Sequence, residues 1–151
     1  MIYQKHNLTY EGTFDHDSMP KIVRIISTEE NIILYSGSIC PQGLRSGQGT
    51  EFAANGDSYV GHFSHDQRNG AGKLFSANNF EKYSGQWANG KKNGKGVEKF
   101  QNTNCSYYGT FENNVRQGYG EEYFDNGDSY EGNYFEGHKQ GKGLMRFFDG
   151  G

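Results

Sequence analysis

The pentapeptide Tyr83-Ser-Gly85-Gln-Trp87 contains the pattern that decides the fold of this chain. The pattern is a tyrosine, a glycine two residues later and an aromatic residue two residues after the glycine. Its copies begin at Tyr10, Tyr35, Tyr59, Tyr83, Tyr107 and Tyr130, and Ile39 replaces the last ring in the second copy. Successive copies start 25, 24, 24, 24 and 23 residues apart. A constant period of this length is the signature of a repeat protein.

A Gly-x-Gly pair follows the pentapeptide in every unit except the first, which has the apolar segment 21–26 instead. The pairs are Gly47/Gly49, Gly70/Gly72, Gly94/Gly96, Gly118/Gly120 and Gly141/Gly143. We therefore divide the chain into an N-terminal segment, residues 1–9, and a repeat array, residues 10–151, whose first unit is degenerate.

The spacing within each unit predicts two β-strands. The two rings and the glycine of the pentapeptide have the same parity, so on a strand they face the same side. The Gly-x-Gly segment forms the second strand, and a polar loop such as residues 88–93 joins the two strands. Between units, Asn55-Gly56 and Asn126-Gly127 predict tight type I′ turns. The predicted fold class is all-β: an elongated, single-layer antiparallel meander of stacked β-hairpins.

The composition fits a thin sheet better than a thick globular core. The 151 residues include 23 glycines, 11 tyrosines and 11 phenylalanines, while only 32% of the residues are hydrophobic. Glycine inside a strand costs about 0.5–1 kcal/mol, and a ring from the adjacent strand that covers the bare Cα compensates for it. We therefore expect the aromatic face to be the core of a sheet roughly 55–60 Å long, at the usual spacing between strands.

These residues resemble the MORN (membrane occupation and recognition nexus) repeat family, whose pattern is Tyr-x-Gly-x-Trp, a turn glycine and then Gly-x-Gly. The resemblance runs from Tyr10 to Gly151, with Gly90 and Gly137 at the turn glycine and Asp66 and Asn114 at the same position in other units. It implies a rod-like β-meander used for scaffolding and protein interaction. The family occurs in cytoskeletal, ciliary and membrane-junction proteins, and sometimes beside a catalytic domain.

Charge and cysteine usage exclude several classes of protein. The net charge of −3 gives no drive toward nucleic acid, and no run of 18 apolar residues predicts a transmembrane helix. The N-terminus lacks the apolar segment of a signal peptide. Cys40 and Cys105 lie 65 residues apart, too far along the array for a disulfide, so we expect free thiols in a reducing compartment. The expected localisation is cytoplasmic, with the cytoskeleton or cilium suggested by the resemblance.

Motifs that suggest catalysis or cofactor binding fit the repeat better. The segment Gly90–Gly96 lacks the glycine spacing and the hydroxyl residue of a phosphate loop. The Gly-x-Gly pairs lack the third glycine and the helix of a dinucleotide site. His62, His65 and Asp66 offer at most three metal ligands in a turn, and Glu121 and Glu122 point to opposite faces of a strand. We expect no enzymatic activity, no cofactor and no metal.

Three apolar side chains occupy positions that the repeat otherwise fills with polar residues. Tyr108 follows Tyr107, and Tyr119 lies between two glycines, so both side chains point away from the aromatic face. Val60 is at the position equivalent to Tyr108. Exposed aromatic residues are enriched at interfaces, so these three residues are candidates for a partner-binding patch. Scattered apolar residues on an ordinary surface are the open alternative.

Charge is distributed unevenly along the array. Residues 83–106 contain Lys91, Lys92, Lys95 and Lys99 against Glu98 alone, whereas residues 107–151 contain eight acidic and four basic residues. Adjacent patches of opposite sign predict an electrostatic docking edge, and head-to-tail self-association is a second use of the same polarity. A normally solvated surface is again the open alternative.

The favoured hypothesis is a non-enzymatic protein-interaction scaffold, a structural subunit of a larger assembly of cytoskeletal or ciliary (axonemal) type. Its partners are the other proteins of that assembly. A first alternative is a peripheral membrane module that binds acidic phospholipids through Lys91, Lys92 and Lys95. A second alternative is the regulatory repeat region of a larger enzyme.

Overall fold

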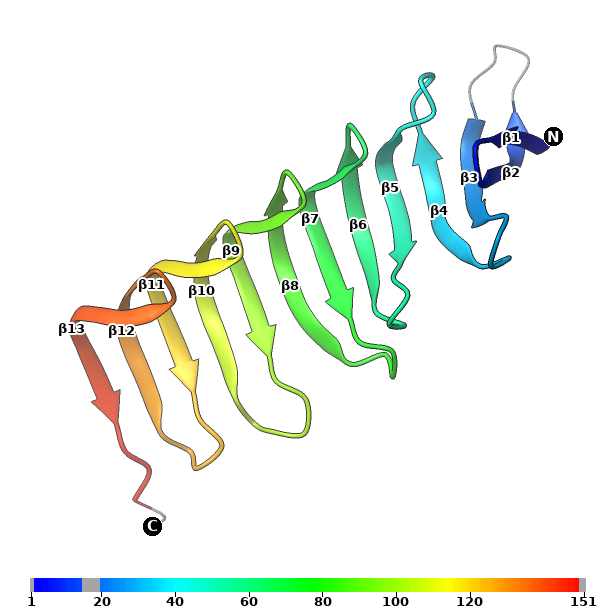
Figure 1. Cartoon of the computed structure of the whole chain (residues 1–151). Coiled ribbons are helices and arrows are strands. Elements are labelled where there is room, and N and C mark those ends of the chain that lie inside the picture. The colour runs from blue at the N-terminus through cyan, green and yellow to red at the C-terminus, as the bar shows by residue number, and fades with distance from the viewer. Residues whose placement is uncertain (1, 15–19, 150–151) are drawn as a thin grey trace.

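The computed structural model of this chain describes residues 2–14 and 20–149 as one open antiparallel sheet (Figure 1). The sheet has 13 strands, and their order across it is their order along the chain. The strands are β1 (Ile2–Lys5), β2 (Leu8–Phe14), β3 (Pro20–Ser27), β4 (Ile33–Ile39), β5 (Arg45–Phe52), β6 (Ser58–Ser64), β7 (Gln67–Phe75), β8 (Glu81–Ala88), β9 (Lys91–Lys99), β10 (Ser106–Glu112), β11 (Val115–Tyr123), β12 (Ser129–Phe135) and β13 (His138–Arg146). The predicted single-layer meander is confirmed. Within the described residues, no helix is long and apolar enough to span a membrane.

Each unit of the repeat is one hairpin of this sheet. The pentapeptide lies on the first strand of the hairpin and the Gly-x-Gly pair on the second, as in β8 and β9. The N-terminal segment adds an element that the sequence did not indicate: β1 pairs with β2, with Tyr3 opposite Tyr10. The side chain of Phe14, residues 15–19 and residues 150–151 of the predicted array lie outside the described residues.

The type I′ turns lie within the hairpins, not between them. Asn89 and Gly90 both have positive φ angles, 49° and 78°, and they form a two-residue loop between β8 and β9. Between units, the Gly56 N–H donates to Ala53 O at 2.9 Å, and only Gly56 has a positive φ angle. This geometry is a type I turn followed by a left-handed glycine. The prediction of type I′ turns at Asn55-Gly56 and Asn126-Gly127 was therefore wrong, because these longer connections place asparagine at negative φ.

The tips of the last four hairpins are each hydrogen-bonded to the preceding hairpin. The second residue of each type I′ turn donates its N–H to a carbonyl at the start of the earlier Gly-x-Gly strand. These bonds run from Asp66 to Arg45, from Gly90 to Arg68, from Asn114 to Lys92 and from Gly137 to Arg116, at 2.9–3.0 Å. The Asn114 side chain accepts a further bond from the Lys92 N–H at 2.8 Å. The predicted loop 88–93 therefore shortens to two residues, since β9 already begins at Lys91.

The core is a continuous ladder of perpendicular rings on one face of the sheet. Tyr35, Tyr59, Tyr83 and Tyr107 are at most 1% exposed. Tyr83 makes edge-to-face contacts with Trp87 of its own unit and with Phe111 of the next, both at 5.3 Å between ring centroids. Equivalent contacts link the rings from Tyr35 to Tyr134. We call this side the aromatic face, and it confirms the predicted core.

The two glycines of each Gly-x-Gly pair serve different purposes. A Cβ atom on the second glycine, Gly96, would lie 2.4 Å from the Tyr83 hydroxyl oxygen, so the ring requires the bare backbone beneath it. The first glycine, Gly94, has a φ angle of 94° and lies in a bulge, where the register between β8 and β9 shifts. Only the first of these reasons was expected from the sequence.

Candidate interaction surface

A row of basic side chains covers the rings of the aromatic face. Its members are Arg45, Arg68, Lys92, Arg116 and Lys139, one on the second strand of each of the last five hairpins. The Arg116 guanidinium carbon lies 4.3 Å from the centroid of the Tyr107 ring, and Lys92 Nζ lies 4.8 Å from that of Tyr83. Cations at this distance are attracted to the ring face. The buried tyrosine that begins each of these five units therefore lies between a glycine and a cation.

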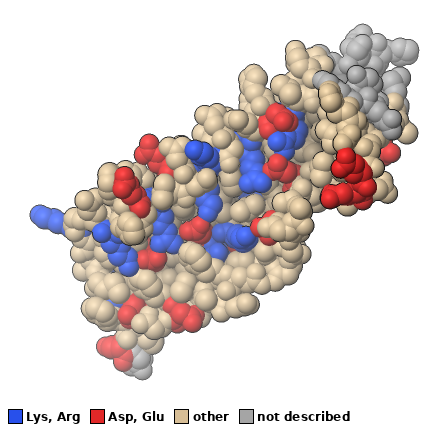
Figure 2. Space-filling view, in the orientation of Figure 1, with Lys and Arg blue, Asp and Glu red and all other residues tan. Residues whose placement is uncertain are grey.

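Glutamates join these cations into ion-pair chains. Glu122 lies between Arg116, at 2.6 Å, and Lys139, at 2.9 Å. Glu98 joins Lys92 to Arg116, and Glu51 joins Arg45 to Arg68. Leu74 occupies the equivalent position between Arg68 and Lys92, as its register opposite Tyr59 shows, so the chain of ion pairs is interrupted there. Figure 2 shows the result as a band of basic and acidic side chains along the molecule.

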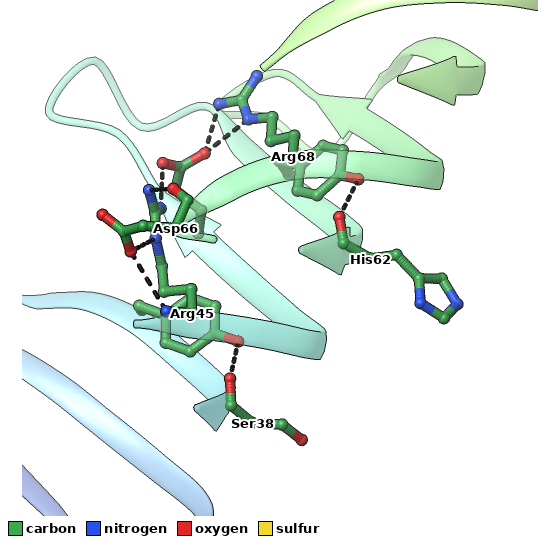
Figure 3. A network of polar contacts seen from close by, with 8 residues as sticks. Ser38, Arg45, His62, Asp66 and Arg68 are labelled. Atoms are coloured by element: carbon green, nitrogen blue, oxygen red, sulfur yellow. Dashed lines mark hydrogen bonds and ion pairs between the residues drawn. The ribbon is translucent and has the colours of Figure 1, made fainter. Parts of the chain in front are cut away.

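Figure 3 shows one part of this network around Arg45, Asp66 and Arg68. Arg45 Nε donates to Asp66 Oδ1 at 2.7 Å, and Arg68 Nε donates to Glu51 Oε2 at 2.6 Å. The same view shows two tyrosine hydroxyls that donate to the backbone carbonyls of Ser38 and His62, each three residues after its tyrosine. For Tyr35 the acceptor is Ser38 O, at 2.8 Å. The buried hydroxyl groups of Tyr35 and Tyr59 are therefore hydrogen-bonded.

The pKa values reflect this arrangement. Burial disfavours the charged form of Glu51, but hydrogen bonds from Arg45 and Arg68 outweigh it and lower the pKa of Glu51 below its ordinary value. Burial raises the pKa of Tyr83 to about 12, and Glu98 contributes to the shift. The charges on the aromatic face are thus paired within the sheet. Each of its five cations contacts a ring and a carboxylate of the same face.

Sequence reasoning missed this network although the repeat carries a signal for it. Each of the five cations lies two residues before the first glycine of a Gly-x-Gly pair. Glu51, Glu98 and Glu122 each lie two residues after the second glycine. Charge summed over a window hides this regularity, whereas charge compared at a fixed offset in the repeat would have found it.

The structure does not gather the four lysines of the candidate docking edge into one patch. Lys92 belongs to the aromatic face, and its ammonium pairs with Glu98. Lys99 pairs with Glu81 at 3.3 Å. Lys95 lies on the other side of the sheet, where it lines a hollow with Tyr108 and Tyr119. Lys91 is exposed at the start of β9.

The candidate aromatic residues lie on the side of the sheet away from the ring ladder, which we call the opposite face. Tyr108 and Tyr119 line one hollow there, and they are 44% and 51% exposed. Val60, 43% exposed, is on the same face but on β6, four strands from Tyr108. The structure therefore brings the two tyrosines together and leaves Val60 apart.

A third tyrosine, which sequence reasoning missed, completes the cluster. Tyr119, Glu121 and Tyr123 alternate along β11 and so share the opposite face, and Tyr108 is directly across from Glu121 on β10. Tyr108 and Tyr123 make an edge-to-face contact at 5.7 Å. We call Tyr108, Tyr119 and Tyr123 the tyrosine triad. The i, i+4 spacing of Tyr119 and Tyr123 on a predicted strand was the available signal.

Hydrogen bonds fix two of the three rings of the triad. The Tyr119 hydroxyl donates to Glu131, and this bond raises the pKa of Tyr119 to about 12. Glu131 is also paired with Arg146 at 2.9 Å. The Tyr123 hydroxyl donates to Glu121 Oε2 at 3.0 Å. The rings of Tyr119 and Tyr123 are thus oriented by their hydroxyl groups, and the Tyr108 ring by its contact with Tyr123. All three side chains remain more than 40% exposed.

The residues considered for metal and thiol chemistry lie apart from the triad. His62 contacts Gln48 on the opposite face, His65 contacts Ser64 in the turn, and Asp66 pairs with Arg45. No group of three side chains that could hold a metal ion occurs among the described residues. Cys40 and Cys105 are free thiols, as predicted.

A family model for the MORN repeat matches residues 42–58, 59–79, 83–105, 107–129 and 130–151, which together make up more than half of the chain. The last four matches begin at the tyrosines where the repeat units begin, and the first covers the second half of the Tyr35 unit. No curated protein matches the chain as a relative. MORN repeats are in general modules that interact with proteins or lipids.

Proposed function

Because this chain belongs to the MORN repeat family, we propose that it is a non-enzymatic scaffold that binds other proteins as a structural subunit of a larger assembly. We place this assembly in the cytoplasm, in the cytoskeleton or the cilium (axoneme). The observation that carries the proposal is the tyrosine triad. Three exposed rings that lie together on one sheet face have the composition and geometry of a protein-binding surface.

The contrast between the two faces supports this assignment. On the aromatic face, the rings are covered by cations, and the cations of the network are paired with carboxylates. On the opposite face, Tyr108, Tyr119 and Tyr123 are each more than 40% exposed. Tyrosine loses little conformational entropy on binding and contributes a large contact area. Partner binding through the opposite face would therefore leave the core intact.

The positions of the lysines support membrane binding less well than they support a protein scaffold. Attraction to anionic lipid requires several basic side chains near one surface. Lys92 is only 17% exposed and pairs with Glu98, and Lys95 lies on the opposite face. Sedimentation with vesicles of acidic phospholipid, at low and high salt, tests this alternative. Salt-sensitive sedimentation that Lys91→Ala and Lys95→Ala abolish would favour the lipid function over the scaffold.

A quantitative pull-down from native extract tests the scaffold proposal. The wild-type chain is compared with the double variant Tyr108→Ser/Tyr119→Ser and with Val60→Ser, which is a matched control because Val60 has the equivalent position and exposure in another unit. We expect the double variant to lose its most abundant partners by about tenfold or more. The control should retain them.

Thermal unfolding followed by circular dichroism should show that all three proteins remain folded, since the substituted side chains are exposed. Equal recovery of every partner by the double variant and the wild type would contradict a docking role for the triad. Loss of partners by the Val60→Ser variant alone would indicate that the interface lies around Val60 instead of the triad.

A further inference from the structure

We propose that the tyrosine triad binds a proline-rich segment in the polyproline II conformation, with an arginine or lysine beside the prolines. This inference rests on the proposed function and names the chemistry of the partner. Two adjacent hollows, strands whose backbone groups are paired in the sheet and the charge of Glu121 favour this ligand.

Two hollows with different linings meet at Tyr108. The first, about 420 Å³, lies between Tyr108 and Tyr119, and its other walls include Val97 and the backbone of Gly96 and Gly109. The second, about 520 Å³, lies between Tyr108 and Tyr123 and includes Asn104 and Ser106. Glu121 borders both hollows. The first hollow suits an apolar ring, and the second suits a polar or charged side chain.

The sheet face favours a ligand that needs no backbone partner. The N–H and C=O groups of β9, β10 and β11 are used in ladders with their neighbours, so a peptide lying on this face cannot add as a strand. A polyproline II segment has no internal hydrogen bonds and keeps its backbone solvated. Aromatic-lined grooves recognise such segments through the flat faces of proline rings.

The dimensions agree with a short segment. Tyr119 and Tyr123 are four residues apart on β11, which corresponds to about 13–14 Å along a strand. Polyproline II rises about 3.1 Å per residue, so four or five residues span the triad. Tyr108 and Tyr123 stand perpendicular to each other, at an interplanar angle of 87°.

The charge of the second hollow selects a basic residue next to the prolines. Glu121 accepts a hydrogen bond from Tyr123, and it has no ion pair among the described residues. Glu131 is already paired with Arg146. A guanidinium or ammonium in the second hollow would meet the Glu121 carboxylate and the face of Tyr108, a favourable site for a cation. Lys95 borders the first hollow and disfavours a cation there.

Calorimetric titration of the whole chain with synthetic peptides tests this proposal. The probes are a peptide of two arginines followed by prolines, an all-proline peptide of the same length, and a peptide in which glycine and serine replace the prolines after the arginines. We expect the first probe to bind with a micromolar Kd, the second about fivefold more weakly and the third not measurably.

Variants then locate the site. We expect Tyr119→Ser to weaken the arginine–proline peptide about tenfold. Glu121→Gln should weaken it about fivefold and leave the all-proline peptide within about twofold of its wild-type Kd. Val60→Ser should leave both unchanged within about twofold, because Val60 is four strands away.

Three results would overturn the proposal: no binding of either proline peptide to the wild type, equal binding by the Tyr119→Ser variant, or equal binding of the glycine–serine peptide. If neither proline peptide bound the wild type, proline-rich segments would be excluded as the partner, but protein binding by the triad would not be. Dependence of native partners on Tyr108 and Tyr119 in the pull-down would then still support the proposed function, so the failures of the two proposals are distinguishable.

Discussion

At the scale of single residues, the repeat is built on two kinds of glycine. Gly96 and its equivalents are required because a buried tyrosine hydroxyl occupies the space where a Cβ would lie. Gly94 and its equivalents are required because the bulge needs a left-handed backbone. A glycine in a hairpin turn, such as Gly90, has open space around it and only its φ angle of 78° to maintain. These differences predict different tolerance to substitution.

We expect Gly96→Ala to destabilise the chain by about 2–3 kcal/mol, because the added methyl group displaces the fully buried Tyr83 ring. The matched control is Gly90→Asn, which should cost less than about 1 kcal/mol, since Asn114 has the equivalent turn position at a φ angle of 75°. Urea unfolding followed by circular dichroism measures both changes. Equal destabilisation in the two variants would contradict the distinction.

The relation between rings and glycines could be predicted because period and parity are visible in the sequence. Turn type could not, because the dipeptide Asn-Gly occurs both within hairpins, at Asn89-Gly90, and between them, at Asn55-Gly56. The loop length that separates the two cases depends on where the strands end. The tyrosine triad was predicted only in part, because Tyr123 contacts Tyr108 across two strands and that contact depends on register.

At the scale of the hairpin, each unit is joined to the next by more than the backbone ladder. The tyrosine ring of one unit contacts a ring of the next unit, and turn N–H groups donate to carbonyls of the preceding hairpin. Glutamates form ion pairs with the cations of two successive units. Arg116 takes part in two of these links. It pairs with Glu98 and Glu122 and covers the Tyr107 ring, and its side chain is only 16% exposed.

We expect Arg116→Met to destabilise the chain by about 1–3 kcal/mol, because two partly buried carboxylates lose a hydrogen-bonded cation. Arg116→Lys should cost less than about 1 kcal/mol, since Lys92 and Lys139 hold the equivalent position in their units. Urea unfolding at low and high salt checks both values. An equal decrease in the free energy of unfolding for Arg116→Met and Arg116→Lys would show that the charge does not contribute.

At the scale of the whole molecule, the buried tyrosines make the fold sensitive to alkaline pH. Burial raises the pKa values of Tyr35, Tyr59 and Tyr83 to about 12, above the ordinary value of 10. Because the folded chain favours the neutral phenol, this stabilisation is complete below pH 10 and is lost as the pH rises toward about 12. Several rings in one ladder contribute together, so the loss is steep.

We therefore expect cooperative unfolding between about pH 10 and 12, with tyrosinate absorbance from the core appearing together with the loss of the β-sheet circular dichroism signal. A pH titration that records both signals measures this coupling, and urea-unfolded protein gives the reference titration of accessible tyrosines. Complete ionisation of tyrosine in a chain that keeps its sheet signal would contradict the expectation.

Because the strands pair in strict sequence order, equivalent positions in successive units lie at regular intervals along the sheet. Val60, Ser84 and Tyr108 occupy successive equivalent positions on the opposite face, so they lie about 10 Å apart at two strand spacings per unit. Inserting or deleting one unit would change the length by one such step and leave every other pairing in register. The distance between two bound partners could thus be altered in whole steps, without rebuilding either docking site.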